Sequence, residues 1–534
     1  MAAHRNQIDP ASARYPGEGG QASILVLLML ALFLLAVLAF AVDYTNIWFQ
    51  RQRLQTAADA ACQAGVMDIY QIAAGATLPN MGFALGPAGN CNAYGSNGPT
   101  MCWYASKNGF DGYSGGGANV SWTFPPTVGG VTPPPSSVSP YPFMQVTVLY
   151  PVRTYFSTLL TGSQTQQVGA IATCGLTSLM EGDVILALNP TASGSYTESG
   201  TGTSVKVSGG TARGIQVNSN SSSAVVMNGG STVDLSKGGP NYTGSDFGVT
   251  GGPSSNSSFT GGATGNWRPL DTPLINPYQS TPAPASVKLI SPLNGTNGKA
   301  VPYGTDGCPD PGSPCQEFWP GYYGSGITLT GGKTAIFNAG IYYMDGPLNV
   351  SGGSTLRMAR AAGQLPTDGM MFFFHSGTVK VTGTGSGSSS LDPVPSTNLT
   401  CDGSTPSASL GIPSMLSGHV LWAQCTSLGT YWDAGHDTND SVGSQRGLLF
   451  FQDASDTANS PILAGGSGIA LAGNMYFHSS TYSDNLTITG NSGVFAATWG
   501  SIVTDSLTIN GGSTVNMLLN PANSLPMTKV ALLQ

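Results

Sequence analysis

The densest group of side chains that could perform chemistry lies late in the chain. Asp433, His436, Asp437 and Asp440 are the only tight cluster of carboxylates and imidazole in the C-terminal two-thirds. Carboxylate oxygens of this kind can bind a hard cation such as Ca²⁺. Such a run is also typical of a solvated loop, and we favour that interpretation. No metal ion and no other cofactor is therefore predicted.

Signatures of known enzyme classes are missing from the sequence. None of the five histidines lies in an HExxH motif, and neither a GxSxG elbow nor a Walker loop occurs. β-Helix enzymes that act on polysaccharides need clustered carboxylates for acid–base work. The C-terminal region has no Asp-Asp pair, and Asp453 and Asp456 are weaker candidates than the cluster above. We therefore predict no catalytic residues, with a β-helix polysaccharide lyase or hydrolase as the second alternative.

Aromatic residues offer another possible function. Trp319, Tyr322, Tyr323, Tyr342 and Tyr343 could form a flat platform on which sugar rings stack. Aromatic side chains usually bury their large apolar area, so packing in the interior is the favoured interpretation. A surface adhesin or glycan-binding protein that acts without a pilus is kept as the first alternative.

Composition and cysteine spacing indicate an oxidising compartment. Only 8% of residues are charged and the net charge is −8, which argues against nucleic-acid binding because that requires clustered Lys and Arg. No CxxC motif occurs among the eight cysteines. An even number of cysteines at short separations is typical of disulfides outside the cytoplasm. The expected pairs are Cys91 with Cys102, Cys308 with Cys315, Cys401 with Cys425, and Cys62 with Cys174.

An uncharged apolar segment lies near the N-terminus. Residues 22–42 consist mainly of Leu, Ala and Val, and their number matches the roughly 20 residues of a membrane-spanning helix. A cleaved signal peptide is the other interpretation, since residues 39–41 have the small-x-small form of a cleavage site. Retention is favoured because the helical pattern continues. One stripe of a helix extends through Ile47, Leu54, Ala58, Ala61, Gly65 and Ile69.

Several blocks around this segment match a known family. Residues 20–22, 41–43, 51–55 and 57–61 form a pattern whose most specific part is AVDYTNIWFQRQRLQTAADAA. This pattern resembles the N-terminal domain of TadE/TadG-like proteins of Flp-type pilus assembly, sharply over about residues 19–66 and more weakly over 146–160 and 168–174. The resemblance implies an inner-membrane anchor with a periplasmic or surface-exposed remainder. It also implies pilus or secretion-apparatus components as partners.

Two positions depart from patterns found in related proteins. Pseudopilins that are cut by prepilin peptidase carry Glu five residues after the cleaved Gly, whereas Leu25 stands at that distance from Gly20. This difference argues against processing and polymerisation as a pilus subunit. Larger family members carry a von Willebrand A domain, but Asn189 stands where its metal-binding Asp should be. We therefore reject that domain.

A short pattern recurs after about residue 180: two alternating apolar residues, a small polar residue and then Gly. It begins at Val205 and Val225, at Ile327 and Leu348, and at Leu486 and Leu507, with spacings of about 20 residues. A fuller signature, [NS]GGST[VL], occurs at 228–233, 351–356 and 510–515. Strand-like units at a fixed period predict a parallel β-solenoid, although a β-sandwich with similar hairpins is the alternative.

The solenoid hypothesis predicts specific pairs of stacked residues. Residues one period apart should stack inside the coil, which pairs Val207 with Met227, Leu329 with Val350, and Ile488 with Ile509. Two long insertions, at about 261–320 and 384–442, should project from the stack.

The sequence as a whole predicts a mainly β protein with an N-terminal transmembrane helix. The expected parts are a cytoplasmic tail (1–20), a transmembrane helix (21–42), a helix with a small α+β module (43–180), and a β-helix-like parallel β-solenoid (181–534). The expected protein is a single-pass inner-membrane protein without enzymatic activity, structural or adhesive in role and associated with Tad/Flp pilus assembly. Its C-terminal bulk is expected to be periplasmic or surface-exposed, with surface glycans as a further possible partner and no nucleic acid.

Overall fold

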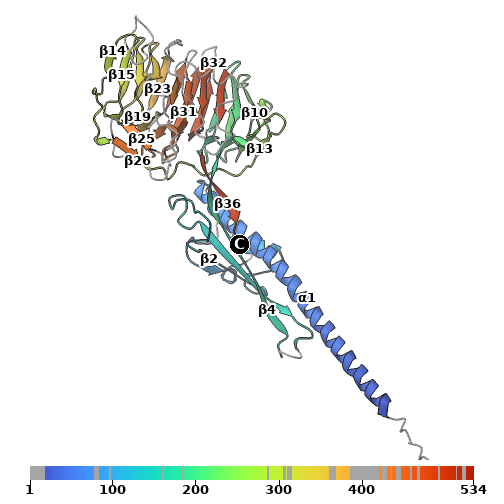
Figure 1. Cartoon of the computed structure of the whole chain (residues 1–534). Helices are drawn as coiled ribbons and strands as arrows, with labels where there is room; N and C mark the ends of the chain where they lie inside the picture. The colour runs from blue at the N-terminus through green and yellow to red at the C-terminus, as the bar shows by residue number, and fades with distance from the viewer. Residues whose placement is uncertain are drawn as a thin grey trace, which may run out of the picture.

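The computed structural model is elongated, with a long helix that carries a small module and a large β-rich body (Figure 1). It describes residues 18–76, 83–95, 98–158, 162–182, 184–284, 288–304, 308, 315–359, 369–384, 420–423, 430–433, 436–439, 445, 447–456, 460–465, 470–490, 494–512, 514–519 and 525–533.

One uninterrupted helix, α1 (Glu18–Ala73), connects the apolar segment to the module. Its first part is exposed along residues 22–42, whereas its second part buries the predicted stripe from Leu54 to Ile69. Ala-rich sequence favours the helix here, because Ala loses no side-chain entropy in it. The prediction that the helix continues beyond the apolar run is confirmed.

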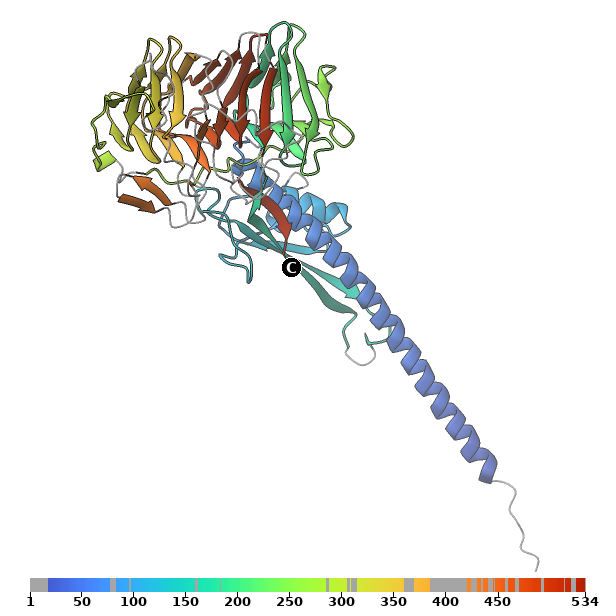
Figure 2. The ribbon, with the colours of Figure 1, turned by 45° about the horizontal axis from the view of Figure 1, so that its top comes forward.

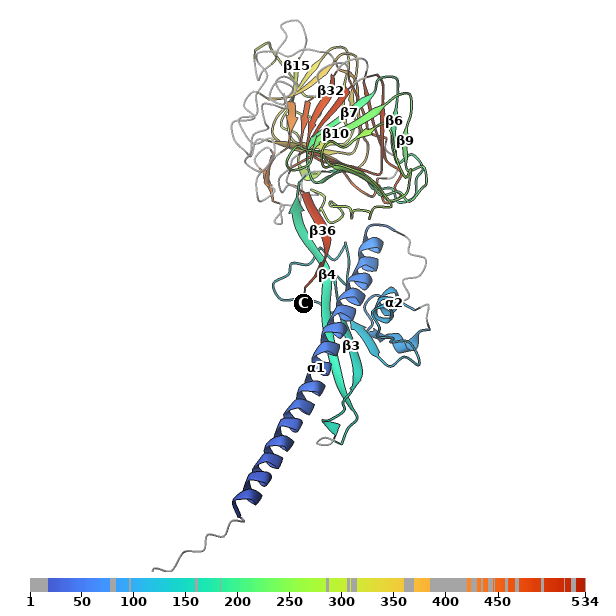
Figure 3. The same cartoon turned by 90° about the vertical axis from the view of Figure 1, so that its right-hand side faces the viewer.

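The N-terminal module is an antiparallel sheet packed on the second half of α1 (Figure 3). Its strand order is β1 (Gly89–Asn90), β2 (Asn119–Thr123), β3 (Phe143–Arg153), β4 (Thr165–Glu181) and β36 (Leu525–Leu532). The 3-10 helix η1 (Cys91–Ala93) and helix α2 (Thr100–Lys107) lie between β1 and β2. Strand β36 pairs with β4 from Leu525↔Glu181 to Leu532↔Cys174, so the predicted domain 181–534 gives its last strand to the N-terminal sheet.

The body contains three large sheets in which every strand pairing is parallel. The ten-stranded sheet has the order β13 (Trp267–Pro269), β11 (Asp246–Val249), β8 (Arg213–Val217), β5 (Ile185–Ala187), β33 (Ile502–Thr504), β30 (Asn474–Phe477), β27 (Leu448–Gln452), β22 (Met370–Phe374), β19 (Gly340–Met344) and β16 (Gly321–Tyr323). The eight-stranded sheet has the order β17 (Ile327–Leu329), β20 (Leu348–Val350), β23 (Val379–Thr384), β28 (Ile462–Gly465), β31 (Asn485–Gly490), β34 (Ser506–Asn510), β6 (Tyr196–Ser199) and β9 (Val225–Met227).

The remaining strands complete the third large sheet and two small ones. The seven-stranded sheet has the order β12 (Phe259–Thr260), β10 (Thr232–Gly238), β7 (Ser204–Gly209), β35 (Thr514–Leu519), β32 (Val494–Trp499), β29 (Ala470–Ala472) and β24 (Val420–Trp422). A four-stranded sheet has the order β14 (Lys299–Val301), β15 (Cys315–Phe318), β18 (Thr334–Phe337) and β21 (Thr355–Met358). Strands β25 (Thr430–Asp433) and β26 (His436–Asn439) form a hairpin. The parallel sheets predicted from the repeats are therefore present.

The chain enters and leaves the body in the middle of its strand order. From β5 the strands add outward to β12 and β13, after which the chain crosses to β14, β15 and β16 at the other end. It then returns until β33, β34 and β35 pair with β5, β6 and β7. Figure 2 shows this order as green strands at one end, red strands in the middle and yellow strands at the other end.

Two of the three predicted pairings are confirmed and one is wrong. Leu329↔Val350 and Ile488↔Ile509 are direct partners in the eight-stranded sheet. Val207 and Met227, in contrast, belong to different sheets, because β7 pairs with β10 and β9 pairs with β6.

The error came from treating two different corners of the chain as equivalent. Gly229, with φ 73°, approaches the backbone of Gly200, and an added Cβ would lie 3.1 Å from the Gly200 nitrogen. The turn before β10 therefore stacks on the turn before β7. Gly209-Gly210, which spacing alone makes its equivalent, instead lies at the turn after β7. The fuller [NS]GGST[VL] signature marks the true repeat, because its three copies directly precede or begin β10, β21 and β35.

Apolar residues fill the space between the sheets and also cover one outer face. The main core takes residues from all three large sheets and the four-stranded one, including Val350, Phe372 and Ile509. A second cluster lies on the outer face of the ten-stranded sheet and includes Tyr343 and Phe373. Burial on both faces explains why its strands read as continuous apolar runs such as MMFFF, whereas the eight-stranded sheet alternates, as in LTITG.

A charge placed inside the stack should disrupt the body. Val350 is fully buried, and Val350→Asp would bury an unpaired carboxylate at a cost of several kcal/mol. We expect the purified variant to melt at a clearly lower temperature by circular dichroism. Thr328→Asp is the matched control, because Thr328 is exposed on the neighbouring strand and its replacement should change stability little. Equal effects of the two substitutions would contradict this arrangement.

Candidate functional site: the membrane helix and its docking to the module

The first half of α1 has the properties of a membrane span. Among the described residues, α1 is the one helix that is both long enough and apolar enough to cross a bilayer. Its most apolar window has a mean hydropathy of 3.2. Residues 22–42 would rise about 30 Å at 1.5 Å per residue, which is about the thickness of a bilayer's hydrocarbon core. Their large apolar side chains contact little else in the protein, so a bilayer is the environment that suits them.

Polar contacts on one side of α1 fix its second half to the sheet. The Asn46 side chain donates to the Arg153 carbonyl (3.1 Å), and the Gln55 side chain donates to the Ile171 carbonyl (3.1 Å). Further along, a disulfide joins Cys62 to Cys174 on β4. Together with the buried apolar stripe, these contacts hold the module to the anchor over most of the length of β3 and β4.

Asp43, the first residue after the apolar run, makes the contact nearest the membrane. The residue is 2% exposed, and its carboxylate accepts hydrogen bonds from the amides of Tyr155 (2.9 Å), Phe156 (2.8 Å) and Ser157 (2.6 Å). The bond from Ser157 is the main cause of a lowered pKa for this carboxyl, with those from Tyr155 and Phe156 adding to it against the opposing effect of burial. Asp43 therefore stays ionised at neutral pH, and its stabilising effect is lost only as the pH falls through this lowered pKa.

Two further disulfides match the pairs expected from the sequence. Cys91–Cys102 connects η1 to α2, and Cys308–Cys315 connects the start of β15 to the segment before it. Cys401 and Cys425 lie outside the described residues.

The module and the body meet at a cleft of about 630 Å³ near the end of α1. Its walls include Tyr70 from α1, Arg213 from β8 and an ion pair between Lys529 and Glu181. The segment after β13 also links the two parts, since Ile275 packs into the module core while Leu274 packs against the outer face of the ten-stranded sheet. These contacts make the cleft part of the junction.

The candidate metal ligands lie largely outside the residues whose side chains the structure describes. Asp433, His436 and Asp437 lie on the β25–β26 hairpin, where Asp433 is the backbone partner of His436. The positions of their side chains, and Asp440 entirely, lie outside the described residues. The prediction that this cluster is a solvated loop without a metal ion therefore stays untested.

The favoured interpretation of the aromatic residues, packing in the interior instead of a platform for sugars, is confirmed for three of the five. Tyr323 and Tyr342 are fully buried in the main core, and Tyr343 is buried in the cluster on the outer face of the ten-stranded sheet. Tyr322 is half-buried and donates a hydrogen bond to Asp345 (2.8 Å). Burying the large apolar area of these rings stabilises the folded state, so these residues contribute to packing.

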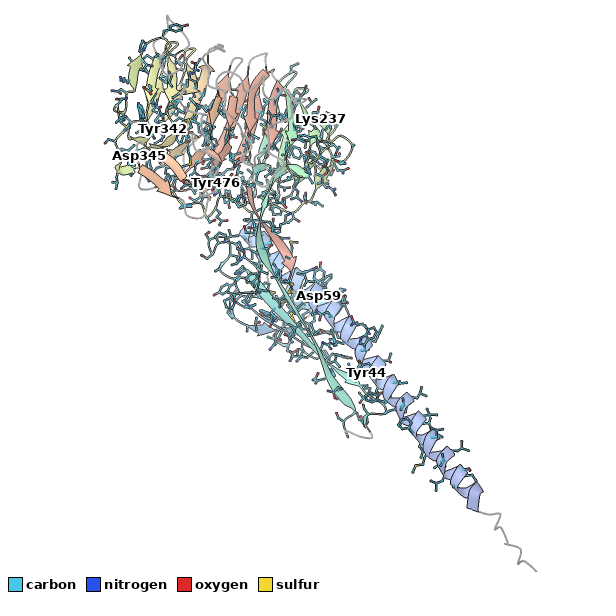
Figure 4. The ribbon with its side chains drawn as sticks, in the orientation of Figure 1. Tyr44, Asp59, Lys237, Tyr342, Asp345 and Tyr476 are labelled. Carbon is cyan, nitrogen blue, oxygen red and sulfur yellow. A yellow bond between two sulfur atoms is a disulfide. The ribbon has the colours of Figure 1, made fainter. Side chains whose placement is uncertain are left out.

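Two close His–Asp pairs were not found from the sequence. His375 Nδ1 lies 2.6 Å from Asp345 Oδ1, and His478 Nδ1 lies 2.6 Å from Asp505 Oδ1. All four residues directly follow strands of the ten-stranded sheet, and Figure 4 labels Asp345 and Tyr476 on this part of the body. Their separations of 30 and 27 residues do not match the 20–21-residue repeat.

The arrangement around Asp505 favours a structural role. Asp505 is fully buried, and it also accepts hydrogen bonds from the amides of Ser479 (3.1 Å) and Asp484 (3.0 Å). The Ser479 hydroxyl is hydrogen-bonded to the Asp505 carboxylate (3.2 Å), whereas a Ser-His-Asp relay requires the serine to contact the imidazole. Asp505 therefore holds the loop between β30 and β31.

A buried acid inside the main core was also missed. The Tyr196 hydroxyl donates to the Glu198 carboxylate, and both residues are fully buried. Desolvation raises the pKa of Glu198 to about 7. The period-two pattern of β6 placed Glu198 on the inner face, but the sequence gave no reason for an acid there.

Comparison with known proteins gives a family match that covers the N-terminal helix. Fold and helix together define a β-rich protein with a single candidate membrane helix among its described residues. Residues 20–68 match the family described as putative Flp pilus-assembly TadE/G-like. The resemblance seen in the sequence is thus confirmed for the N-terminal helix. No curated protein and no solved structure matches the chain.

Asp43→Asn should loosen the loop between β3 and β4. A neutral amide accepts hydrogen bonds more weakly than a carboxylate, so we expect amides 155–157 to exchange with deuterium on the order of tenfold faster. Hydrogen-exchange mass spectrometry of the full chain in vesicles would measure this. Asp59→Asn is the matched control, because Asp59 accepts from Gln55 (2.7 Å) far from the loop. Unchanged exchange in Asp43→Asn would contradict the role of this carboxylate.

Glu198 should make the body less stable as pH rises. The folded pKa of about 7 exceeds the ordinary value of 4.5, so the folded state holds the proton more tightly between these values. The contribution of protonated Glu198 to the free energy of unfolding is complete below about pH 4.5. Roughly 3 kcal/mol of this stability is lost as the pH rises through 7. Melting curves at pH 5.5 and 8 should differ more for the wild type than for Glu198→Gln. Parallel pH profiles of the two proteins would rule out this effect.

Proposed function

We propose that the protein is an inner-membrane-anchored structural component associated with Tad/Flp pilus assembly. The observation that carries this proposal is the family match over residues 20–68, which coincides with the membrane-compatible part of α1 and its docking surface. In this arrangement residues 1–20 form a short cytoplasmic tail, and residues after 42 lie on the periplasmic or outer side.

Chemistry of the described residues supports that orientation. Disulfides occur on both sides of the junction, in the module and near β15. Disulfides persist in the periplasm and at the cell surface, whereas cytoplasmic thiols are kept reduced. A chain with only 8% charged residues and abundant Gly, Ser and Thr is also compatible with the outside of the cell.

The body would then be a rigid β-solenoid held away from the membrane by α1 and the module. Support comes from the shared core of its three large parallel sheets and from pairings such as Leu329↔Val350. In such a stack each coil contacts only its neighbours, which gives an extended and stiff unit. A stiff unit on a stalk suits a scaffold or spacer in an assembly apparatus.

The two alternatives have less support. A glycan-binding adhesin loses its aromatic platform to burial, and a polysaccharide lyase or hydrolase would need a cluster of carboxylates. Asp345 and Asp505 instead belong to separate His–Asp pairs. We therefore keep the structural role.

Removal of the gene from its host should test the function. We expect the cells to lose Flp pili in electron micrographs, and the full chain to restore them. A chain without residues 18–42 should fail to restore pili, because it lacks the anchor. In the complemented cells, mass spectrometry of the membrane-extracted protein should find residues that precede Ala41. Normal piliation of the deletion strain, or a mature N-terminus at Val42, would contradict the proposal.

A further inference from the structure

The tip of the β3–β4 hairpin exposes large aromatic side chains. Tyr155 and Phe156 lie two and three residues after the end of β3 and are 65% and 46% exposed. Aromatic rings usually bury most of their area, so two neighbouring exposed rings at a loop tip indicate a surface that something else covers.

The position of this tip relative to α1 is fixed by hydrogen bonds. Asp43 directly follows the apolar run and accepts from the amides of Tyr155, Phe156 and Ser157 at 2.6–2.9 Å. If residues 22–42 fill the hydrocarbon core, Asp43 lies at its boundary and the tip lies at the same depth. Figure 3 shows the hairpin extending beside α1 toward the helix's N-terminal half.

The helix presents aromatic residues at the same level. Tyr44, Trp48 and Phe49 are exposed and lie within two helical turns of Asp43, and Tyr44 stacks on Phe40 with ring centroids 6.4 Å apart. Figure 4 labels Tyr44 on α1 beside the lower end of the hairpin. Tyr and Trp are enriched where membranes meet water, because their amphipathic rings sit well at the headgroup level.

From this juxtaposition we infer that the β3–β4 hairpin tip is a second membrane contact, in which Tyr155 and Phe156 enter the headgroup region of the bilayer beside α1. The inference rests on the proposed membrane anchor. The partner that covers the hairpin tip is a phospholipid surface, because the tip is hydrogen-bonded to Asp43, which directly follows the apolar run of α1. The exposed Arg153 on β3 would lie close to the lipid phosphates.

A second contact would fix the orientation of the whole molecule. A single helix leaves the attached module free to tilt and rotate relative to the bilayer. Two contacts on a module that is bound to α1 by Asn46, Gln55 and the Cys62–Cys174 disulfide would remove most of that freedom. The body would then project from the membrane at a set angle.

Photocrosslinking of the full chain in phosphatidylethanolamine–phosphatidylglycerol vesicles tests this inference. Benzoylphenylalanine is placed at one of three exposed positions: 34 in the apolar run, 156 at the tip, or 104 in α2 as a control away from the membrane. Each position is exposed, so the substitution should leave the fold intact. We expect mass spectrometry to find lipid adducts at positions 34 and 156, with none at 104.

The other outcomes separate this inference from the anchor. A lipid adduct at 34 without one at 156 would overturn the second contact and leave the anchor standing. A crosslink from 156 to a second copy of the chain would also overturn it, and would identify the tip as a protein interface. The absence of an adduct at 34 would overturn both the anchor and the inference. Equal lipid labelling at 104 and 156 would show that contact with lipid is not specific to the tip.

Discussion

The backbone hydrogen bonds that join the first strands of the body to β33, β34 and β35 decide the shape of the molecule. Strands β5, β6 and β7 pair in parallel with β33, β34 and β35, although more than 300 residues separate them. Because the chain enters and leaves the body at these neighbouring strands, β4 and β36 emerge together and pair in the N-terminal sheet. A body whose neighbouring strands followed sequence order would place its two ends far apart, and could not attach to one stalk through both.

This double attachment has a mechanical consequence. Two strands cross between the module and the body, and the segment after β13 adds contacts on a third side through Ile275 and Gln279, which donates to the Ser137 carbonyl (3.0 Å). Force on the body would therefore be shared by several backbone connections and packed contacts. The disulfide between Cys62 and Cys174 continues that connection from β4 to α1, and so to the membrane.

Polar groups inside this apolar framework are placed where the backbone needs partners. Asp43 satisfies three amides at the hairpin tip, and Asp505 satisfies two at the loop after β30. Unpaired buried amides are costly, so a buried carboxylate at a loop stabilises a conformation that the loop alone would not keep. Glu198 differs from both, because its raised pKa reflects a carboxyl in an apolar core.

Local patterns in the sequence determined the helix and two of the strand registers. The apolar run and the Ala-rich stripe specify α1, because helical periodicity is a property of neighbouring residues. The [NS]GGST[VL] signature marked the turns that lead into β10, β21 and β35, and two pairings in the eight-stranded sheet followed from spacing alone. The tertiary structure alone decided the pairing of β5, β6 and β7 with β33, β34 and β35, the return of β36, the His–Asp pairs and the partners of Asp43. Each of these joins residues whose separation in the chain carries no period, so no local pattern encodes them. They arise because distant strands need backbone partners, and because buried polar groups must find their partners wherever the packed sheets place them.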